Sequence, residues 1–593
     1  MPDGVDVCGR GFREDKFTTE TRKRGEEPQP KAKPFDTEEL RKQRERRSLK
    51  SKQNRIKSRW WILGSMSENV HSALRNRISS VYGHMNLDWQ VCSRARLSRD
   101  ARFDGRFFVG VLSTRIYCRP ICPAPTAKEK NVRYFPSAAA AAEAGFRPCL
   151  RCRPECSPGT AAWLGTPSTV SRALRLISES SLEPGGMEAL AERLGIGARH
   201  LRRLFLKHLG ATPSAVVQTR RLNFAKKLID ETSLPMTQVA VSSGFGSVRR
   251  FNATIQKTYH RTPSHIRRLA RQKTIQPENE YCFQLRFRPP YHWNGMLAFL
   301  ALRAIPGVEV VEGEVYRRSI SLHGQDGYFE VSRNETSAVL AVRIQFADPR
   351  SLFFVIERIR AMFDLSADWS DIARTLKKDP ALLARVEAAP GLRVPGCWNG
   401  FELAIRAILG QQITVKAATT LAGRIARTFG RPFCADNHLT HLFPSEDVLA
   451  TADLTRVGLT RARAETIRSL ARAVCDGQIN FEGVVDTDRF LARLCEISGI
   501  GRWTAQYVAM RALGEPDALP SSDLGLLRAL AMNDTSELER RAETWRPWRA
   551  YATMYLWSVA GAHGVRPGRS IASKAAKSLA ESSPPRQSAS MHL

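Results

Sequence analysis

The chain has 593 residues, which is too long for a single hydrophobic core and indicates about four domains. Hydrophobic residues make up 42% and charged residues 25%, as in ordinary globular proteins, but the net charge of +33 is unusual. This excess favours a polyanionic partner such as nucleic acid over a basic tail that binds nothing specific, because neutralised phosphates release counterions. No apolar run reaches the roughly 18 residues of a membrane span. The N-terminus has no signal-peptide pattern, so we expect a cytoplasmic protein without a membrane partner.

Both ends of the chain are polar. Residues 1–84 are rich in Lys, Arg and Glu and predict a basic disordered extension, and residues 566–593 predict a disordered tail. The ordered pattern begins at Met85, which is a candidate translation start. Between the ends we expect a multidomain, mainly α-helical protein with α+β parts. Its predicted domains are 85–160, 161–272, 279–366 and 367–565.

The first domain carries a cluster of cysteines in IYCRPIC and RPCLRC, spaced C-x3-C, 26 residues, C-x2-C. Two close pairs separated by a loop suit tetrahedral zinc, and a reducing compartment disfavours disulfides. The alternative is four unconnected buried cysteines; Cys156 is interpreted as a bystander. The spacing therefore predicts one zinc ion held by Cys118, Cys122, Cys149 and Cys152.

The stretch RFDGRFFVGVLSTRIYCRPIC, followed by AAEAGFRPCLRC, resembles the N-terminal domain of Ada-type alkylation-response proteins. The resemblance implies that Cys118 takes a methyl group irreversibly from a DNA methylphosphotriester. Zinc would keep its sulfur as the nucleophilic thiolate. A four-thiolate site has a net charge of about −2, and methylation removes one negative charge, so binding to DNA phosphates would tighten.

The Ada-type resemblance also implies DNA contacts in this domain. Thr114 and Arg147 match positions that touch DNA. Two arginines of the family are replaced here by Pro123 and Pro125, which puts those phosphate contacts in doubt.

Residues 161–272 read as two helix-turn-helix units, with turns at Gly195–Gly197 and near Gly244. A purely structural helical hairpin is the alternative for either unit. Two units separated by GATPSAVVQTRRLNFAKKLI resemble an AraC-type domain, which implies promoter DNA and RNA polymerase as partners. The residues expected to reach DNA are Arg202, Arg203, Arg249 and Arg250. Those expected to face the core are Phe205, Leu209, Phe251 and Tyr259.

The C-terminal half changes from strand to helix periodicity. YCFQLRFRPPYHW, RRSISL, GYFEVSR and AVLAVRIQF alternate as strands do and predict a small β-rich subdomain at 279–366. From Trp369 the apolar residues fall at helical spacing, as in FELAIRAILGQQITVKAATTLAGRIA, and predict an all-α domain at 367–565.

A Gly-Ile-Gly turn lies between two of these helices, in ISGIGRW. Gly499 and Gly501 let the backbone approach a DNA phosphate, which by itself indicates only non-specific DNA binding. Asp523 follows about twenty residues later, and this combination resembles helix-hairpin-helix base-excision glycosylases. The chain from Tyr281 to about Gly561 is most similar to the AlkA-type 3-methyladenine DNA glycosylases, as in PPYHWNGMLAFLALRAIPGVE, GLRVPGCWNGFELAIRAILGQQ and WRPWRAYATMYLW.

The AlkA-type resemblance implies a cleft between two helical parts. Trp503, Tyr507 and Trp557 match aromatics that bind a cationic alkylated base by cation–π attraction. Asp523 matches the catalytic aspartate. Its alternative role is a helix cap in SSD before LGLLRAL, and both roles can hold together. Trp545 and Trp548 are interpreted as structural.

Departures from the AlkA-type pattern refine the prediction. Trp503 stands where strand-cutting glycosylases carry a lysine, so we expect a hydrolytic enzyme without lyase activity. Gln411 matches the family, but the wedge leucine aligns with Gln412, and Ile413 is an alternative wedge. Ser558 replaces a pocket tyrosine, so the preference among damaged bases is open.

The hairpin resembles those of the family in a further respect. Carbonyls of Cys495, Ile497 and Ile500 match positions that hold a monovalent cation.

The sequence thus predicts a fusion of a methylphosphotriester sensor, a transcriptional activator and a glycosylase that releases 3-methyladenine, 7-methylguanine and similar bases from double-stranded DNA. No PCHR motif of a guanine-methyl acceptor is found. Two alternatives stay open: an enzyme whose N-terminal half only tethers it to DNA, and a regulator with an inactive glycosylase fold.

Overall fold

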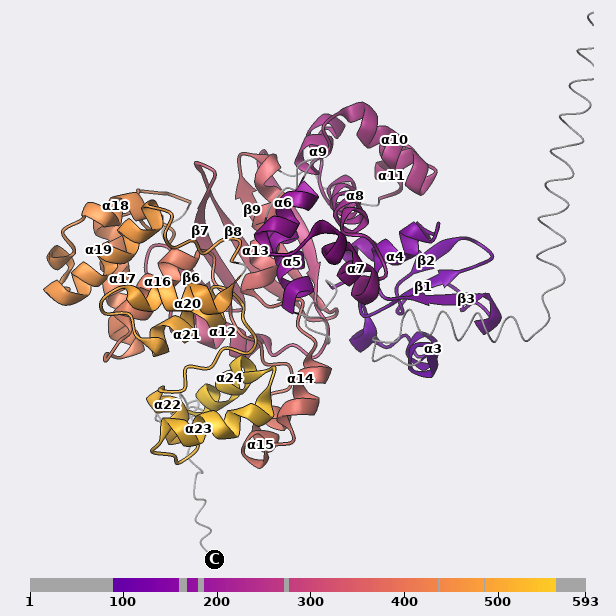
Figure 1. Ribbon diagram of the computed structural model, residues 1–593. Coiled ribbons are helices and arrows are strands. Elements are labelled where there is room, and N and C mark those ends of the chain that lie inside the picture. Colours follow the sequence, from indigo (N-terminus) through magenta and orange to yellow (C-terminus); the bar gives the residue numbers. More distant parts are fainter. Residues whose placement is uncertain are drawn as a thin grey trace, which may run out of the picture. The chain divides into compact units, whose positions relative to one another are not determined.

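The computed structural model describes residues 89–158, 168–179, 186–270, 277–435, 438–484 and 486–560. The predicted extension at 1–84, the candidate start Met85 and the predicted tail at 566–593 lie outside this range. A small α+β domain, a set of helices, a five-stranded sheet and a larger helical domain follow one another along the chain (Figure 1), which confirms the predicted fold class. Within the described ranges, every helix is too short or too polar to cross a bilayer.

The first domain is built on a four-stranded sheet in the order β3-β1-β2-β4. β1 pairs antiparallel with β2 and β3, and β2 pairs parallel with β4. Gly110 in β1 is required by packing, because a Cβ there would lie 2.6 Å from the Phe135 ring and 2.9 Å from the Phe146 ring. The elements are α3 (Trp89–Leu97), β1 (Phe108–Val111), β2 (Ile116–Cys118), β3 (Val132–Phe135), α4 (Ala138–Glu143) and β4 (Arg147–Pro148), with short 3-10 turns at Ala101–Phe103, Glu129–Asn131 and Pro154–Cys156.

In the part of the chain that the structure describes, helices α5 to α11 follow, and they contain two helix-turn-helix units, α6–α7 and α9–α10. Gly195 (φ +66°) and Gly244 (φ +74°) occupy left-handed turns of the two units, a conformation that glycine adopts readily. Phe205, Leu209, Phe251 and Tyr259 are buried, as predicted. The helices are α5 (Ser168–Glu179), α6 (Gly186–Arg193), α7 (Ala198–Leu209), α8 (Pro213–Glu231), α9 (Met236–Ser242), α10 (Val248–Tyr259) and α11 (Pro263–Leu269).

The third part is a sheet of five strands in the order β5-β9-β8-β7-β6, in which every neighbouring pair is antiparallel. Its apolar face is part of a continuous core together with α12 and α13. The β-rich character agrees with the alternating sequence pattern. The elements are β5 (Glu280–Arg286), α12 (Trp293–Ala301), β6 (Glu309–Glu312), β7 (Val315–Leu322), β8 (Gln325–Asn334), β9 (Val339–Phe346) and α13 (Leu352–Met362), with a 3-10 turn at Pro349–Ser351.

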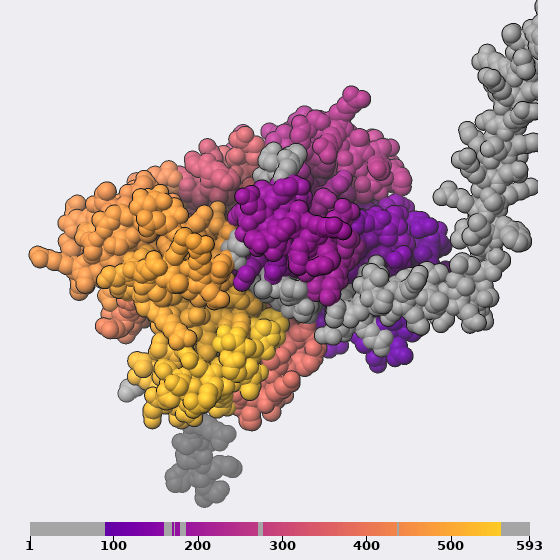
Figure 2. All heavy atoms as spheres, viewed as in Figure 1, coloured from indigo at the N-terminus to yellow at the C-terminus, as the bar shows by residue number. Residues whose placement is uncertain are grey.

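The C-terminal domain is all-helical and has two apolar cores. α21 contributes to both, since Val508 packs in the first core and Met510 in the second. In the filled view the orange surface of the first part meets the yellow surface of residues 524–560, whereas residues 369–388 of the second part are salmon (Figure 2). The first part holds α16 (Gly400–Leu409), α17 (Val415–Phe429), α18 (Glu446–Thr451), α19 (Arg461–Cys475), α20 (Thr487–Glu496) and α21 (Arg502–Arg511), and the second holds α14 (Trp369–Leu376), α15 (Pro380–Ala388), α22 (Leu524–Ala529), α23 (Thr535–Ala542) and α24 (Arg549–Ala560), with 3-10 turns at Leu454–Val457 and Glu543–Trp545. Trp545 and Trp548 are buried in the second core, as predicted.

A buried ion network ties the five-stranded sheet to α16. Arg318 on β7 donates to Glu309 on β6 at 2.8 Å and also bonds Glu402 on α16. Arg406 on α16 lies 3.0 Å from the other oxygen of Glu309. Burial alone would raise the pKa of Glu309, but Arg406 and Arg318 outweigh it and hold this pKa at about 2. The network therefore fixes α16, the helix that precedes the loop at 410–414.

Replacing Arg318 with methionine leaves buried carboxylates with one cation fewer. We expect the free energy of unfolding to fall by about 3–5 kcal/mol, measured as a shift of the calorimetric transition. Arg343→Met, which removes a half-exposed arginine paired with Glu330 on the same sheet, should cost less than about 1 kcal/mol. Equal shifts in the two variants would contradict this assignment.

The same network makes stability depend on pH. Because the pKa of Glu309 is lowered in the folded protein, the stabilisation from its ion pairs is complete above the unfolded-state pKa of 4.5 and is lost as the pH falls toward 2.

Candidate functional site

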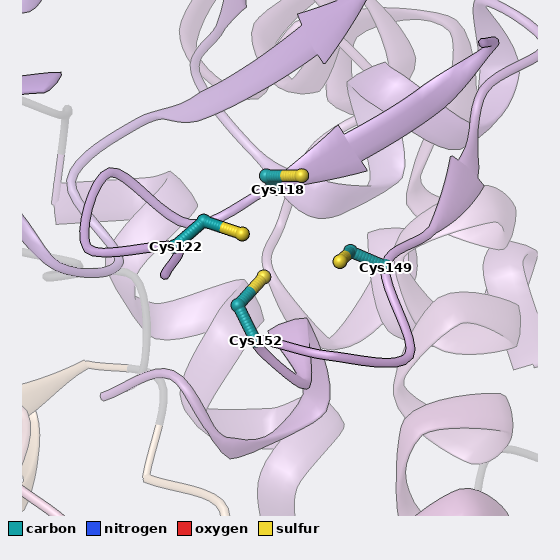
Figure 3. Close-up of side chains that lie close together, drawn as sticks. All are labelled: Cys118, Cys122, Cys149 and Cys152. Carbon is teal, nitrogen blue, oxygen red and sulfur yellow. The ribbon is translucent and has the colours of Figure 1, made fainter. Parts of the chain in front are cut away.

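Four cysteines converge at one end of the first sheet. Cys118 ends β2, Cys122 lies in the following loop, and Cys149 and Cys152 follow β4. Their sulfur atoms all lie within 4.8 Å of one another and point toward a common centre (Figure 3). A tetrahedral zinc site with Zn–S bonds of about 2.3 Å separates its sulfurs by roughly 3.8 Å, so the arrangement fits zinc. The structure thus brings together the four residues that the spacing predicted, and leaves Cys156 outside the cluster.

A buried arginine that the sequence reasoning did not single out supports this cluster. Arg119 follows Cys118 and is only 2% exposed. Its backbone amide donates to the Cys152 sulfur at 3.4 Å, and its guanidinium donates to the Cys152 carbonyl at 3.0 Å and to the Asp104 carboxylate at 2.7 Å. The guanidinium, paired with Asp104, thus anchors the Cys152 loop beside the cluster. The sequence had one indication of this support: Asp104 lies in the stretch RFDGRFF, on which the Ada-type resemblance was drawn.

The two other residues predicted to contact DNA in this domain lie in the β1–β2 turn and at the start of β4. Thr114 is exposed in the turn between β1 and β2, and Arg147 is half-buried at the start of β4, opposite Ile116. Pro123 and Pro125 are exposed and offer no donor to a phosphate.

The predicted recognition helices present their arginines to solvent. Arg202 and Arg203 on α7 and Arg249 and Arg250 on α10 are exposed. Ser247 caps α10 by accepting the Arg250 amide at 3.2 Å. The arginines can therefore reach a duplex while the apolar residues of the same helices hold the core.

Asp523 joins α21, α22 and α24. One carboxylate oxygen accepts the indole N–H of Trp503 at 2.9 Å. The other accepts the indole N–H of Trp557 at 3.0 Å and the amide of Leu526 at 3.0 Å, which caps α22. Gly525 is tightly packed here, because a Cβ on it would lie 2.9 Å from the carboxylate. Asp523 thus caps a helix, as the alternative interpretation held, and also lies directly between two of the predicted pocket aromatics.

The three predicted aromatics form one continuous group around this carboxylate. Trp503 stacks on Tyr507 with ring centroids 5.5 Å apart and an interplanar angle of 13°. Tyr507 and Trp557 lie 6.1 Å apart at 47°. Ser558, which replaces a tyrosine of the family pattern, donates to the Tyr555 carbonyl at 2.8 Å. The electron-rich faces of these rings are suited to an aromatic cation.

Two arginines that the sequence analysis did not predict, Arg303 and Arg511, lie close to Tyr507. Arg511 donates to the Tyr507 hydroxyl at 2.7 Å, and Arg303 lies 3.8 Å from the centroid of Phe299. Burial would raise the pKa of Tyr507, but the positive charges of Arg511 and Arg303 outweigh it, so the pKa is below its ordinary value. Arg511 follows Tyr507 by one helical turn, and this spacing could have predicted that the two side chains meet.

The Gly-Ile-Gly turn connects α20 to α21. Gly499 adopts φ +90°, and a Cβ there would lie 2.2 Å from the Thr466 hydroxyl. Gly501 faces open space at the N-terminus of α21. Ile500 is buried and anchors the turn in the core. Gly499 is therefore needed for the fold of the turn, and Gly501 leaves the backbone open to a close approach from outside.

The loop after α16 holds Gln411 and the two candidate wedge residues, Gln412 and Ile413. Gln411 donates its side-chain amide to the Gly499 carbonyl and to the Thr504 hydroxyl, each at 2.9 Å. Gln412 is exposed with φ +59°. Gln411 therefore bonds the hairpin, whereas Gln412 is exposed and Ile413 is half-buried.

Four family models match the chain in succession. They are the metal binding domain of Ada over 91–155, a helix-turn-helix domain over 190–269, the AlkA N-terminal domain over 282–399 and the HhH-GPD superfamily of base excision DNA repair proteins over 405–549. These matches confirm the resemblances drawn from the motifs. The domain boundaries themselves stay predictions.

Curated relatives show the same combination of domains. The chain is 40% identical over 485 residues to the probable bifunctional transcriptional activator/DNA repair enzyme AlkA of Mycobacterium tuberculosis, with 80% of this chain and 97% of that protein covered. It is 31% identical to DNA-3-methyladenine glycosylase 2 of Escherichia coli, over 47% of this chain and 98% of that protein. A solved 3-methyladenine DNA-glycosylase from Archaeoglobus fulgidus is 24% identical and covers 47% of this chain and 98% of its own, with a TM-score of 0.42.

The fold and the sites define a DNA-binding protein that joins an Ada-type zinc domain and a helix-turn-helix domain to a helix-hairpin-helix glycosylase fold. The chain belongs to the family of bifunctional transcriptional activator/DNA repair enzymes of the AlkA type.

We expect the wild-type chain to retain about one zinc ion through dialysis against a weak chelator, since four thiolates complete a closed structural site. Cys149→Ser removes one ligand and should lower the retained zinc at least tenfold, as measured by elemental mass spectrometry. Cys156→Ser changes a buried cysteine outside the cluster and should keep the wild-type zinc content. Equal zinc loss in both variants would contradict the assignment.

Proposed function

We propose that this chain senses methylphosphotriesters in DNA, activates transcription in response, and hydrolyses the N-glycosidic bond of 3-methyladenine, 7-methylguanine and similar bases. The observation that carries the catalytic part is the carboxylate of Asp523, held between the indoles of Trp503 and Trp557. Family membership supports the combination of a regulator and an enzyme.

The aromatic group accounts for the choice of base. Alkylation at N3 or N7 makes a purine cationic and weakens its glycosidic bond. The base must leave the duplex, at a cost of a few kcal/mol of unstacking. Each ring face then favours a cationic base over a neutral one by about 0.5–2 kcal/mol. Arg511 donates to the Tyr507 hydroxyl and so fixes this ring in the pocket.

Asp523 acts on the sugar side. As the bond breaks, positive charge develops on the deoxyribose, and a fixed carboxylate stabilises it. A carboxylate has about four acceptor sites, and Asp523 uses three of them for two indoles and a backbone amide. The remaining site can orient the attacking water and accept its proton. Trp503 has no amine for a Schiff base, so the enzyme hydrolyses the bond without cutting the strand.

Cys118 is the methyl acceptor in the zinc domain. Its sulfur attacks the methyl carbon of the phosphotriester, a C–S bond forms, and the C–O bond breaks with its electron pair left on the phosphate oxygen. When bound, zinc holds the sulfurs as thiolates and lowers the pKa of each. Arg119 keeps the loop of Cys152 in place beside the acceptor. Thr114 and Arg147 hold the phosphate backbone.

The loss of one negative charge at Cys118 removes repulsion from DNA phosphates. The arginines of α7 and α10 then read adjacent major grooves of a promoter, and RNA polymerase is recruited beside them. At the hairpin, the carbonyls of Cys495, Ile497 and Ile500 would hold a monovalent cation.

The first catalytic test replaces Asp523 with asparagine, which keeps the volume and can keep the helix cap but lacks the charge and the acceptor for one indole. Release of 3-methyladenine from alkylated duplex DNA should fall at least about 100-fold, because a charge that stabilises the transition state is lost. Asp534→Asn is the matched control, since Asp534 caps the neighbouring helix α23, and it should act as wild type. A fully active Asp523→Asn protein would refute the role, and a wild type that releases no base would favour a regulator with an inactive glycosylase fold.

The second test follows the methyl group. After incubation with methylated DNA, the peptide that contains Cys118 should gain the mass of one methyl group, at no more than about one per chain, by peptide mass spectrometry. Cys118→Ala should abolish both this gain and reporter activation after methylating stress, whereas Cys156→Ala should preserve both. Reporter activation that survives in Cys118→Ala would favour an enzyme whose N-terminal half is only a tether.

A further inference from the structure

Positive charge collects beside the pocket that is proposed to bind a cationic base. Arg511 on α21 is 4% exposed and donates to the Tyr507 hydroxyl at 2.7 Å. The guanidinium of Arg303, which follows α12, lies 3.8 Å from the centre of the Phe299 ring, and that of Arg511 lies 4.7 Å from the same ring. Two guanidinium groups thus contact one aromatic ring, and one of them also holds the Tyr507 hydroxyl.

No carboxylate neutralises Arg303 or Arg511 in the part of the chain that the structure describes. They bond uncharged backbone carbonyls instead, two at 2.8 and 3.0 Å for Arg511 and one at 3.3 Å for Arg303. Arg406, a third arginine whose charge acts on Tyr507, differs from them because it lies 3.0 Å from the carboxylate of Glu309. The positive charge of Arg303 and Arg511 therefore needs another partner.

Two further ionisable groups lie on the elements around Tyr507. Burial raises the pKa of Cys397 to about 12, so this thiol is neutral near Arg511. Asp523 accepts its hydrogen bonds from the two pocket indoles and a backbone amide, not from an arginine. The Tyr507 hydroxyl is the remaining group. Burial would raise its pKa, but the two arginines outweigh burial and hold this pKa below the ordinary 10.0.

We propose that Tyr507 binds a cationic base as a phenolate, with Arg303 and Arg511 as the positioning residues that stabilise its negative charge. The two guanidinium groups by themselves would repel an aromatic cation. When the phenol releases its proton to solvent, a negative charge lies next to the arginines, and the Tyr507 ring becomes richer in electrons and attracts the cation more strongly. This inference deepens the proposed glycosylase function and rests on it.

The first measurement follows the phenol by ultraviolet absorbance, in the zinc-loaded full chain without DNA. The difference between wild type and Tyr507→Phe should show one tyrosine that ionises below the ordinary pKa of about 10. Arg303→Met should raise this pKa by about 1 or more, whereas Arg303→Lys keeps the charge and should stay closer to wild type. Arg385→Met, which removes another half-buried arginine bonded to a backbone carbonyl, is the matched control and should leave this pKa unchanged.

The second measurement compares two probes of similar shape, the permanent cation 3,9-dimethyladeninium and the neutral 9-methyladenine, by quenching of tryptophan fluorescence. Because cation binding releases a proton, the affinity of the wild type for the cation should rise at least about threefold from about pH 6.5 to about pH 8.5. The affinity for the neutral probe should change less than about twofold over this range. Tyr507→Phe and Arg303→Met should flatten the cation profile, and Arg385→Met should preserve it.

Arg511→Met should also flatten the cation profile, and the half-buried Arg303 keeps the proposal testable if that variant does not fold. A Tyr507 that ionises at its ordinary pKa would overturn the proposal, and so would cation binding by the wild type that is undetectable or independent of pH. A wild type that binds the cation with the expected pH dependence but releases no 3-methyladenine from alkylated DNA would instead refute the proposed glycosylase function.

Discussion

The carboxylate of Asp523 receives three donors from three different helices, and the C-terminal site depends on this arrangement. Two of the donors are indoles whose rings line the pocket, and the third is the amide that begins α22. A single group therefore sets the end of a helix, the orientation of two aromatic rings and the position of a negative charge. Because this carboxylate is already fixed in place, the site needs no rearrangement when positive charge develops beside it.

α21 connects this carboxylate to the DNA-facing elements. The hairpin glycine Gly501 is its N-cap residue, its first turn carries Trp503 and Thr504, and its later turns carry Tyr507 and Arg511. Because the helix packs in both apolar cores, a shift of one part of the domain would displace packed side chains in the other. The bonds from Gln411 extend the same rigid unit to the loop after α16, and the buried ion network around Arg318 fixes α16 to the sheet.

Two sites in this chain use different chemistry on the same polyanionic partner. The zinc domain uses soft sulfur ligands in a closed cluster, whereas the glycosylase fold uses an oxygen anion between aromatic rings. Both act on DNA lesions made by alkylation, one on the phosphate and the other on the base, under the function proposed here. The net charge of +33 suits all of these domains to the same ligand.

Local patterns in the sequence were sufficient for the elements and for the residues with conspicuous chemistry. Cysteine spacing identified the zinc ligands, helical and strand periodicity separated the sheet from the helical domain, and the Gly-Ile-Gly turn with Asp523 indicated the glycosylase fold. Aromatic side chains such as Trp545 and Trp548 were correctly assigned to the core because their neighbours are apolar at helical spacing. These features depend on residues that lie close together in the chain.

Only the tertiary structure determined how distant residues meet. It showed Arg119 and Asp104 beside the cysteines, Arg303 close to Tyr507, and Gln411 bonded to the hairpin 88 residues away. The sequence could name Gln411 and Gln412 as a pair, but only the structure shows that Gln411 bonds the hairpin while Gln412 is exposed with a positive φ. Side-chain hydrogen bonds between remote segments leave no periodic trace in a sequence, because each partner by itself looks like an ordinary polar residue.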